Sequence, residues 1–260
     1  MQKDIHFYTT YALARKAGVS KEDSLHIAWA DQFTDDCTEA GLYGIQTQSR
    51  ILGNWTDKQI QHTVLVPFHF VPGDYTWVVR PFSKRIREIT AQALNNPFQL
   101  GIALHTLQDT FSHQGFTGWQ EKENACYPFW YLQSTIPNIG HAEMGLLPDI
   151  TNAKWTDPRT GKTIQNNARA LLCAEWTYKF LMGGGDVELT IWADLAISLA
   201  QIFREKNYDN RKSALRRLAG EDDSFRYSAL GHKWIGDFVS AARKHLSLVM
   251  DSIKDLSCDD

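Results

Sequence analysis

The sequence predicts an all-α protein, a single-domain multi-helix bundle over residues 1–260. Apolar residues recur at helical spacing along most of the chain, and no convincing run of alternating apolar and polar residues indicates strands. With 43% hydrophobic and 22% charged residues, the composition is that of a globular protein and argues against disordered and fibrous classes. A chain of 260 residues is also long enough to bury a large core.

Two helices are expected at the start of the chain. Residues 11–17 place apolar side chains at helical spacing, and Gly18 suits the position just beyond a helix end. The following "SKED" is a capping-box pattern with Asp in place of the usual Glu, and it begins a second helix that runs toward Asp35. Asp31 and Asp35 would share one face of this helix.

The middle of the chain combines an irregular segment with two further helices. The prolines and the glycine of "VPFHFVPGDY" favour an irregular path around His69. Residues 82–95 are expected to form a helix, and Pro97 suits the first turn of the next one, which contains "LHTLQDTFSHQGF". Residues 116–140 are rich in aromatic side chains and predict a loop-like segment.

The last part of the chain is expected to complete the bundle with helices inside residues 160–255. A glycine triplet at 183–185 interrupts the helical pattern there. Three stretches fit helices: 163–181, 187–206 and 224–253. The candidate functional residues come mostly from residues 1–150.

His105, Asp109 and His113 follow one another at intervals of four within an apolar helix. Residues four apart in a helix project to nearly the same side. Two imidazoles and a carboxylate on one side can bind one metal ion, or two adjacent ions with the carboxylate between them, and zinc takes both ligand types readily. The alternative is an ordinary contact between His and Asp along a helix.

The other histidines favour the metal interpretation. Five of the nine histidines stand beside apolar residues with carboxylates nearby: His6, His69, His105, His113 and His141. Glu143 and Asp149 follow the last of them. A buried imidazole needs hydrogen-bond partners or a metal, so one shared metal site explains the set better than five independently satisfied histidines. The remaining four are expected to be surface or packing residues: His26, His62, His232 and His245.

The order of these residues resembles that of the zinc-dependent phospholipase C family, whose fold is shared with the single-strand-specific zinc nucleases. The stretches that carry the resemblance are "DIHFYTTYALARKAG", "QFTDD", "VPFHF", "LGIALHTLQD" and "GHAEMGLLPD". The likeness extends from Asp4 to about Asp149, and the chain is most similar to an uncharacterised branch of that superfamily. The resemblance implies a helical bundle of the phospholipase C type.

The resemblance also implies a centre of two or three zinc ions. The implied ligands of the first ion are Asp31 or Asp35, together with His69, His105 and Asp109. Asp109 would also bridge to a second ion, which takes His6. The implied ligands of a third ion are His113, His141 and one of two carboxylates, Glu143 or Asp149.

Three departures from the family pattern affect these assignments. The family begins with a tryptophan whose amine and carbonyl bind metal, whereas this chain begins with Met-Gln-Lys-Asp, so Asp4 is a candidate substitute. His113 follows Asp109 by four residues rather than six, which keeps it on the helix. Gly145 stands where the family has the glutamate of an HxxxE pair, which leaves a two-ion centre as an alternative to three ions.

The expected function is a metal-dependent hydrolase that acts on phosphoester bonds. A cluster of divalent ions activates water, polarises a phosphoryl oxygen and stabilises an alkoxide leaving group. Asp109 would bridge the ions, and Asp31 or Asp35 would orient the water or accept its proton. Two alternatives stay open: a zinc-dependent nuclease or nucleotidase, and a catalytically silent protein that keeps the metal for structure or ligand binding.

The expected partner is a phosphoester substrate, either a phospholipid headgroup or a nucleotide. The net charge of −3 gives no general attraction to nucleic acid, so no stable nucleic-acid partner is expected. The aromatic segment 116–131 suits membrane-surface contact, stacking on bases or plain loop packing. No segment approaches the roughly 20 apolar residues of a membrane span. The N-terminal stretch lacks the apolar core of a signal peptide, so we expect a cytoplasmic protein or one exported by another route.

The four cysteines are scattered without CxxC spacing. This distribution predicts neither a disulfide framework nor a thiolate metal site. Buried or incidental thiols are expected instead.

Overall fold

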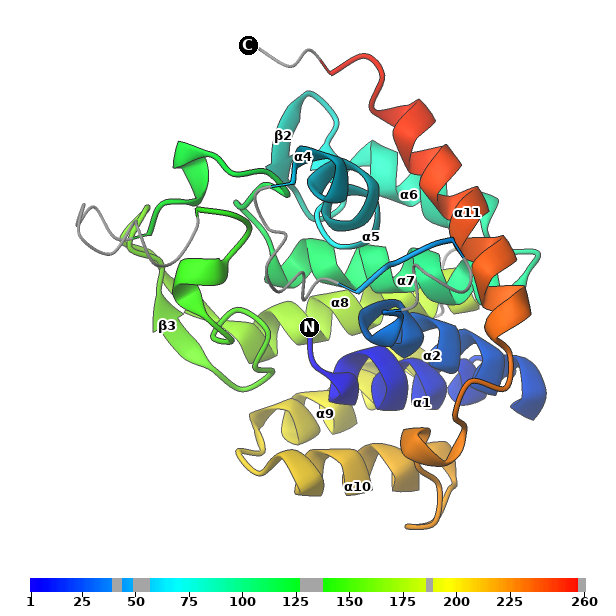
Figure 1. Cartoon of the computed structure of the whole chain (residues 1–260). Helices are drawn as coiled ribbons and strands as arrows, with labels where there is room; N and C mark the ends of the chain where they lie inside the picture. The colour runs from blue at the N-terminus through cyan, green and yellow to red at the C-terminus, as the bar shows by residue number, and fades with distance from the viewer. Residues whose placement is uncertain (39–43, 49–56, 127–137, 186–188, 257–260) are drawn as a thin grey trace.

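The protein is mostly helical, as predicted, and its helices surround one central helix (Figure 1). A computed structural model describes five stretches of the chain: residues 1–38, 44–48, 57–126, 138–185 and 189–256. The central helix is α7 (Pro97–Ser112), and it is buried on all sides from Leu100 to its end. The helices that pack against it include α2 (Lys21–Asp36), α6 (Lys84–Gln92), α8 (Asn166–Leu181) and α11 (Ile235–Ser252).

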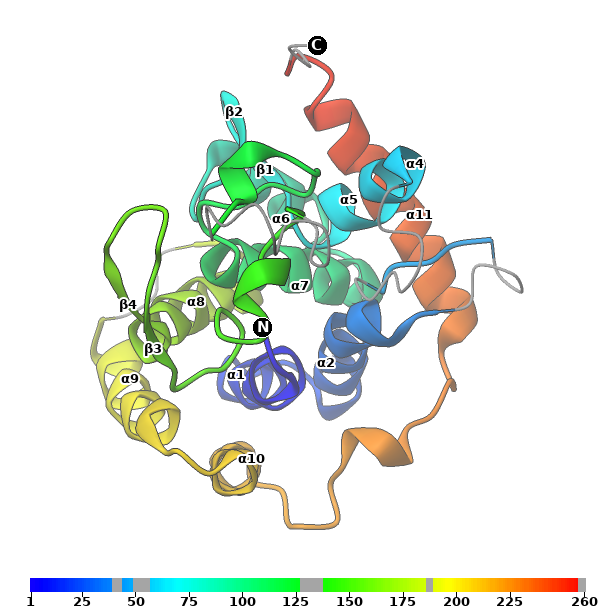
Figure 2. The ribbon, with the colours of Figure 1, turned by 60° about the vertical axis from the view of Figure 1, so that its left-hand side comes forward.

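The two predicted N-terminal helices are confirmed. Helix α1 (Thr10–Lys16) ends at Gly18, whose φ of 79° lies in the left-handed region that glycine tolerates. Ser20 caps α2, because its side chain accepts a hydrogen bond from the Asp23 amide. The structure differs from the prediction before α1, where residues Asp4–Thr9 form a π-helix, η1. His6 therefore lies inside a helical segment rather than before one. In both views the N-terminus lies between α7 and the α1–α2 pair (Figure 2).

The segment around His69 is irregular only in part. A helical path leads up to it in three short pieces: α4 (Lys58–Ile60), the π-helix η2 (Gln61–Leu65) and α5 (Val66–Phe68). Pro67 is tolerated within α5 because it occupies the first turn, where its missing N–H is not needed. After His69 the chain forms a small antiparallel hairpin of β1 (Pro72–Gly73) and β2 (Thr76–Val79). The prediction of an irregular path is therefore wrong for Val66–Phe68 and correct afterwards.

The segment that follows α7 is loop-like where the structure describes it. It contains two single 3-10 turns, η3 (Lys122–Asn124) and η4 (Ala142–Met144). Gln120 and Ile139 form an isolated antiparallel bridge. Residues 127–137, which include much of the predicted aromatic cluster, lie outside the described residues. A second unpredicted hairpin, β3 (Lys154–Thr156) with β4 (Thr163–Gln165), leads into α8.

The C-terminal helices differ from the predicted ones in two places. The expected helices at 163–181 and 187–206 correspond to α8 and α9 (Leu189–Arg204). The expected helix at 224–253 is wrong in its first third, where only the 3-10 turn η5 (Tyr227–Ala229) occurs before α11. Helix α10 (Tyr208–Ala219) was not predicted, because few of its residues are apolar and only Arg211 and Leu215 are buried.

None of the helices in the described part of the chain is long and apolar enough to span a membrane.

The main core draws its residues from the whole length of the bundle, from Ile5 to Ile253. Cys37, Cys126 and Cys173 are buried free thiols, as predicted, and Cys258 lies outside the described residues.

The approach of α2 to α7 is especially close, because Gly101 faces the Ile27 carbonyl. A Cβ atom at Gly101 would lie only 2.3 Å from that carbonyl oxygen. Because Gly101 has no side chain, the backbones of α2 and α7 come into direct contact at this point. These helices carry Asp31 and Asp35, and His105 and Asp109, respectively.

Candidate metal centre

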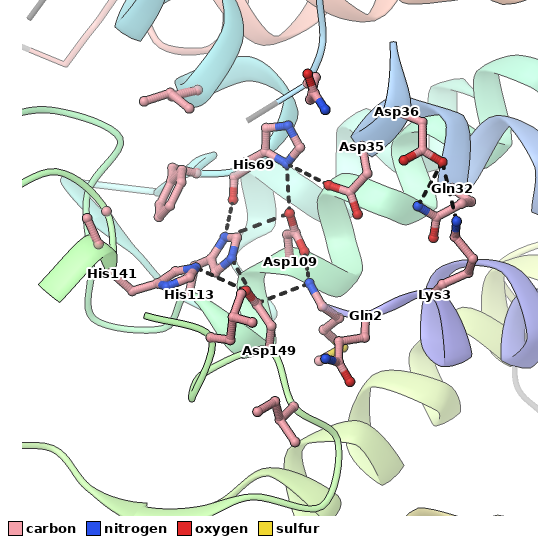
Figure 3. A pocket seen from close by; sticks show the side chains of 18 of the residues that line it. Gln2, Lys3, Gln32, Asp35, Asp36, His69, Asp109, His113, His141 and Asp149 are labelled. Carbon is pink, nitrogen blue, oxygen red and sulfur yellow. Dashed lines mark hydrogen bonds and ion pairs between the residues drawn. The ribbon is translucent and has the colours of Figure 1, made fainter. Parts of the chain in front are cut away.

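Histidine and aspartate side chains from separate parts of the fold converge at one cavity (Figure 3). The cavity has a volume of about 980 Å³. Six of the candidate residues line it: Asp35, His69, Asp109, His113, His141 and Asp149. His6 and His105 lie behind them and are fully buried. The fold thus brings eight of the ten candidate ligands together around one space.

Four of these residues form a compact first cluster. His69 Nδ1 lies 3.1 Å from His105 Nε2, and Asp109 Oδ2 lies 3.0 Å from the first nitrogen and 3.3 Å from the second. Asp35 Oδ1 completes the set at 3.9 Å from His69 Nδ1 and 3.8 Å from His105 Nε2. A tetrahedral zinc ion with bonds of about 2.0 Å separates its ligands by about 3.3 Å. The five distances that involve the two imidazole nitrogens, 3.0–3.9 Å, are therefore close to the edge length of one tetrahedral site.

The second oxygens of the same two carboxylates face His6. Asp109 Oδ1 lies 3.3 Å from His6 Nε2, and Asp35 Oδ2 lies 3.8 Å from it. The α-amino nitrogen of Met1 is 2.6 Å from Asp109 Oδ1. Asp109 is thus placed to bridge the first cluster and a second one around His6.

A third cluster lies beside the second. Asp149 Oδ1 is 3.3 Å from His113 Nε2, and Asp149 Oδ2 is 3.3 Å from His141 Nε2. Glu143, the other candidate carboxylate, instead accepts a hydrogen bond from the Cys126 amide. The late carboxylate that the structure brings to these histidines is therefore Asp149.

Backbone carbonyls fix three of the imidazoles from behind. Each ring uses one nitrogen to contact a carbonyl oxygen: His69 Nε2 at 2.6 Å from Thr47, His113 Nδ1 at 2.8 Å from His69, and His141 Nδ1 at 2.9 Å from Gly145. A carbonyl can only accept, so that ring nitrogen carries the proton and the other nitrogen keeps a free lone pair. Ligand histidines in metal sites are held in this way.

The cluster contains unpaired polar atoms that a cation would satisfy. Among the described residues, four buried atoms in or directly behind the three clusters lack a hydrogen-bond partner: His6 Nε2, His105 Nδ1, Asp31 Oδ1 and Asp149 Oδ1. Leaving a buried polar atom unpaired costs about 1–3 kcal/mol. His6 Nε2 and Asp149 Oδ1 face the second and third clusters, where a divalent ion would pair them. The donor set of imidazole nitrogens and carboxylate oxygens also suits zinc.

Comparison with known proteins gives a family but no activity. The model of a family of unknown function, DUF6765, matches residues 1–254. The chain belongs to this family. No curated protein and no solved structure matches the chain. The match to DUF6765 covers the three clusters and all the helices of the bundle.

Asp31 of this DUF6765 protein lies one turn before Asp35 on α2 but does not line the cavity. Its side chain is fully buried on the far side of His6 and His105. Asp4, the candidate substitute for the N-terminal metal ligand of the phospholipase C family, points elsewhere and pairs with Arg211 at 2.6 Å. Neither aspartate belongs to the three clusters.

Electrostatics in this DUF6765 protein keep Asp109 ionised. Burial opposes ionisation of Asp109, but the Met1 amino group, His113 and His105 hold its pKa well below the ordinary value. Burial lowers the pKa of His105, but Asp109 and Asp35 outweigh this effect and raise it to about 10. In the absence of metal, a proton on His105 thus offsets negative charge on Asp109.

Two groups at the centre escaped the sequence analysis. The Met1 amino group was passed over in favour of Asp4, although the N-terminal amine that binds metal in the phospholipase C family pointed to it. Gln108 contacts His6 Nδ1 through Oε1 at 2.8 Å, and its only signal is its place beside Asp109 on α7.

Proposed function

We propose that this protein is a metal-dependent hydrolase that cleaves phosphoester bonds with two or three zinc ions. One observation carries the proposal: Asp35 and Asp109 oxygens each lie within 3.0–3.9 Å of the two facing nitrogens of His69 and His105, close to tetrahedral ligand spacing, at the wall of a large cavity. Asp109 directs its other oxygen toward His6, as a bridging ligand would. The resemblance to zinc-dependent phospholipases C supports the same reaction class.

Each ion has its own proposed ligands. The first would be held by Asp35, His69, His105 and Asp109. The second would be held by His6 and the second oxygen of Asp109. The third would be held by His113, His141 and Asp149. Asp31 and Glu143 are left out of this assignment because their side chains contact other groups.

Bound divalent ions supply a water of lowered pKa and stabilise charge on the phosphoryl and leaving oxygens. The chain adds a carboxylate that reaches the cavity. The Asp35 side chain is 26% exposed and lines the cavity, whereas Asp31 is fully buried. Of the two candidate bases, Asp35 is therefore the one placed to orient a water molecule or accept its proton.

The cavity also suits a substrate with an anionic group and a less polar part. Its volume of about 980 Å³ lies near the upper end of ligand pockets. Lysine and arginine side chains occur on its wall: Lys3, Lys206 and Arg211. Apolar side chains form another part: Leu65, Phe70, Ile139, Leu146 and Ile150. A phospholipid headgroup and a nucleotide both combine these properties.

Metal content and turnover together test the proposal. Elemental mass spectrometry of the purified protein should find two or three zinc equivalents, and bis(p-nitrophenyl) phosphate should be hydrolysed until a chelator removes them. Restoring zinc should restore turnover. A His105→Ala, Asp109→Ala double variant should lose both metal and activity. His62→Ala, outside the clusters, serves as the control and should keep both.

Two results would contradict this function. Full metal content and full turnover in the double variant would remove the proposed centre. Bound zinc without hydrolysis of any phosphomonoester or phosphodiester would leave a metal-binding protein without the proposed catalysis.

A further inference from the structure

Asp31 lies behind two stacked imidazoles that belong to different clusters. The rings of His6 and His105 are parallel to within 26°, with centroids 4.1 Å apart. Asp31 Oδ1 lies 3.0 Å from His6 Nδ1 and 3.4 Å from His105 Nδ1. One carboxylate oxygen therefore faces the same nitrogen of both rings.

The opposite edges of the two rings face Asp109. His6 Nε2 is 3.3 Å from Asp109 Oδ1, and His105 Nε2 is 3.3 Å from Asp109 Oδ2. Each ring thus extends between an inner carboxylate, Asp31, and a carboxylate beside the cavity, Asp109. The ring edge toward Asp109 carries the nitrogen that would bind an ion, while the edge toward Asp31 carries the other nitrogen.

Two residues outside the clusters, Thr10 and Gln108, fix the position of Asp31 through a chain of hydrogen bonds. Thr10 Oγ1 donates to Asp31 Oδ2 at 2.7 Å, and Gln108 Nε2 donates to Thr10 Oγ1 at 2.8 Å. Asp31 Oδ1 has no hydrogen-bond partner among the described residues, and neither has His105 Nδ1. Because both atoms are buried and 3.4 Å apart, a small rotation of the ring would satisfy the two together.

We infer that Asp31 is not a metal ligand but a positioning residue, shared by two metal sites, that couples their loading; this rests on the metal centre proposed above. An imidazole that binds an ion through Nε2 must carry its proton on Nδ1, and Asp31 favours that form in both rings, at His6 together with Gln108 Oε1, which lies 2.8 Å from Nδ1. Thr10 fixes Oδ2 of Asp31, whereas Oδ1 is unpaired; an ion bound to His105 directs the Nδ1 proton of that ring to Oδ1, the oxygen that also faces His6. The second ion then meets a ring that is already oriented, so the two ions bind with positive cooperativity.

Metal titration of Asp31→Asn tests this inference without measuring catalysis. The metal-free wild type, titrated with zinc against a competing chelator, should take up the first two ions cooperatively, and Co²⁺ absorption should show no singly loaded species. In Asp31→Asn the affinity for both ions should fall by about 10- to 100-fold, as for other outer-shell partners. Their binding should also become independent.

Two further variants provide controls. Asp157→Asn removes another buried carboxylate, which pairs with Arg159 outside the clusters, and should retain cooperative loading. Thr10→Val keeps the Asp31 carboxylate but removes the hydrogen bond to its Oδ2, together with the one that Thr10 accepts from Gln108, and should weaken both sites by a smaller factor. It keeps the test decisive where Asp31→Asn fails to fold.

The possible results separate the inference from the proposed function. No zinc binding by the wild type would overturn the metal centre itself. Normal binding by the wild type, with unchanged affinity and cooperativity in Asp31→Asn and Thr10→Val, would overturn the role of Asp31 alone. Loss of one ion in Asp31→Asn, with the other bound as in the wild type, would make Asp31 a residue of a single site and also overturn the coupling.

Discussion

The Nδ1 atom of His69 and the Nε2 atom of His105 lie 3.1 Å apart, although 36 positions separate these residues in the chain. His69 Nε2 contacts the Thr47 carbonyl, so Nδ1 is the nitrogen left with a lone pair when the ring is neutral. Two such nitrogens repel each other unless a proton or a cation lies between them. The contact therefore links the protonation of the centre to its loading with metal.

The third cluster is expected to hold an ion of its own. Asp149→Asn and His141→Ala should each lower the zinc content of the metal-saturated protein by one equivalent, because each removes a ligand from a site with few others. Elemental mass spectrometry after dialysis measures the change. Glu143→Gln is the matched control, since Glu143 contacts the Cys126 amide, and it should keep the wild-type content. Unchanged zinc content in Asp149→Asn would limit the centre to two ions.

Metal-free stability should depend on pH through His105. Its folded-state pKa is raised to about 10, so its stabilising contribution is complete below the unfolded value of about 6.5 and is lost as pH rises through about 10. Zinc must displace this proton, so its stabilisation grows with pH. The difference in Tm between zinc-loaded and chelated protein should thus increase from pH 6 to pH 8. A difference that stays constant over this range would argue against proton displacement from the centre.

Gly101→Ala should weaken the contact between α2 and α7. The added Cβ would lie 2.3 Å from the Ile27 carbonyl oxygen and 2.8 Å from the Ala30 Cβ. The free energy of unfolding in urea should fall by about 3 kcal/mol, near the upper end for overpacked cores. Gly236→Ala, at a helical position with no atom within 4 Å of the added Cβ, should leave it unchanged or slightly higher. Equal stability of the two variants would refute the close approach.

Arg211→Met should destabilise the protein by leaving Asp4 without its partner. Both side chains are buried and their charged atoms are 2.6 Å apart, so the cost should be about 3–5 kcal/mol. Urea unfolding measures this cost. Replacing Asp4 by Asn in the same protein should recover part of it, because no buried charge is then left unpaired. Arg226→Met, at an exposed position, is the control and should change the free energy by less than about 0.5 kcal/mol.

Local patterns in the sequence were sufficient for some features of the centre. The one-turn spacing of His105 and Asp109 predicts that both side chains project from the same side of α7, and both are found at one cluster. The capping pattern at Ser20 correctly predicts where α2 begins. Such features depend on atoms within a few residues of one another, which the sequence specifies directly.

Other features depend on loops or on weak patterns and were not predictable in this way. Glu143 and Asp149 are equivalent candidates by residue type, but Glu143, within η4, accepts from the Cys126 amide, and Asp149, after η4, is the one that meets His113 and His141. Helix α10 buries only two side chains, so its apolar periodicity is weak. The place of the Met1 amino group has no counterpart in any side-chain pattern.

The sequence by itself determined the helical class and the set of histidines and aspartates available as ligands, because residue type and helical period are local properties. The tertiary structure decided how these residues are shared among three clusters. Asp31 and Asp35 lie on the same side of α2, yet Asp31 is fully buried behind His6, whereas Asp35 lines the cavity. The period of a helix fixes which residues share a face, but the tilt and depth of its packing fix what each of them meets.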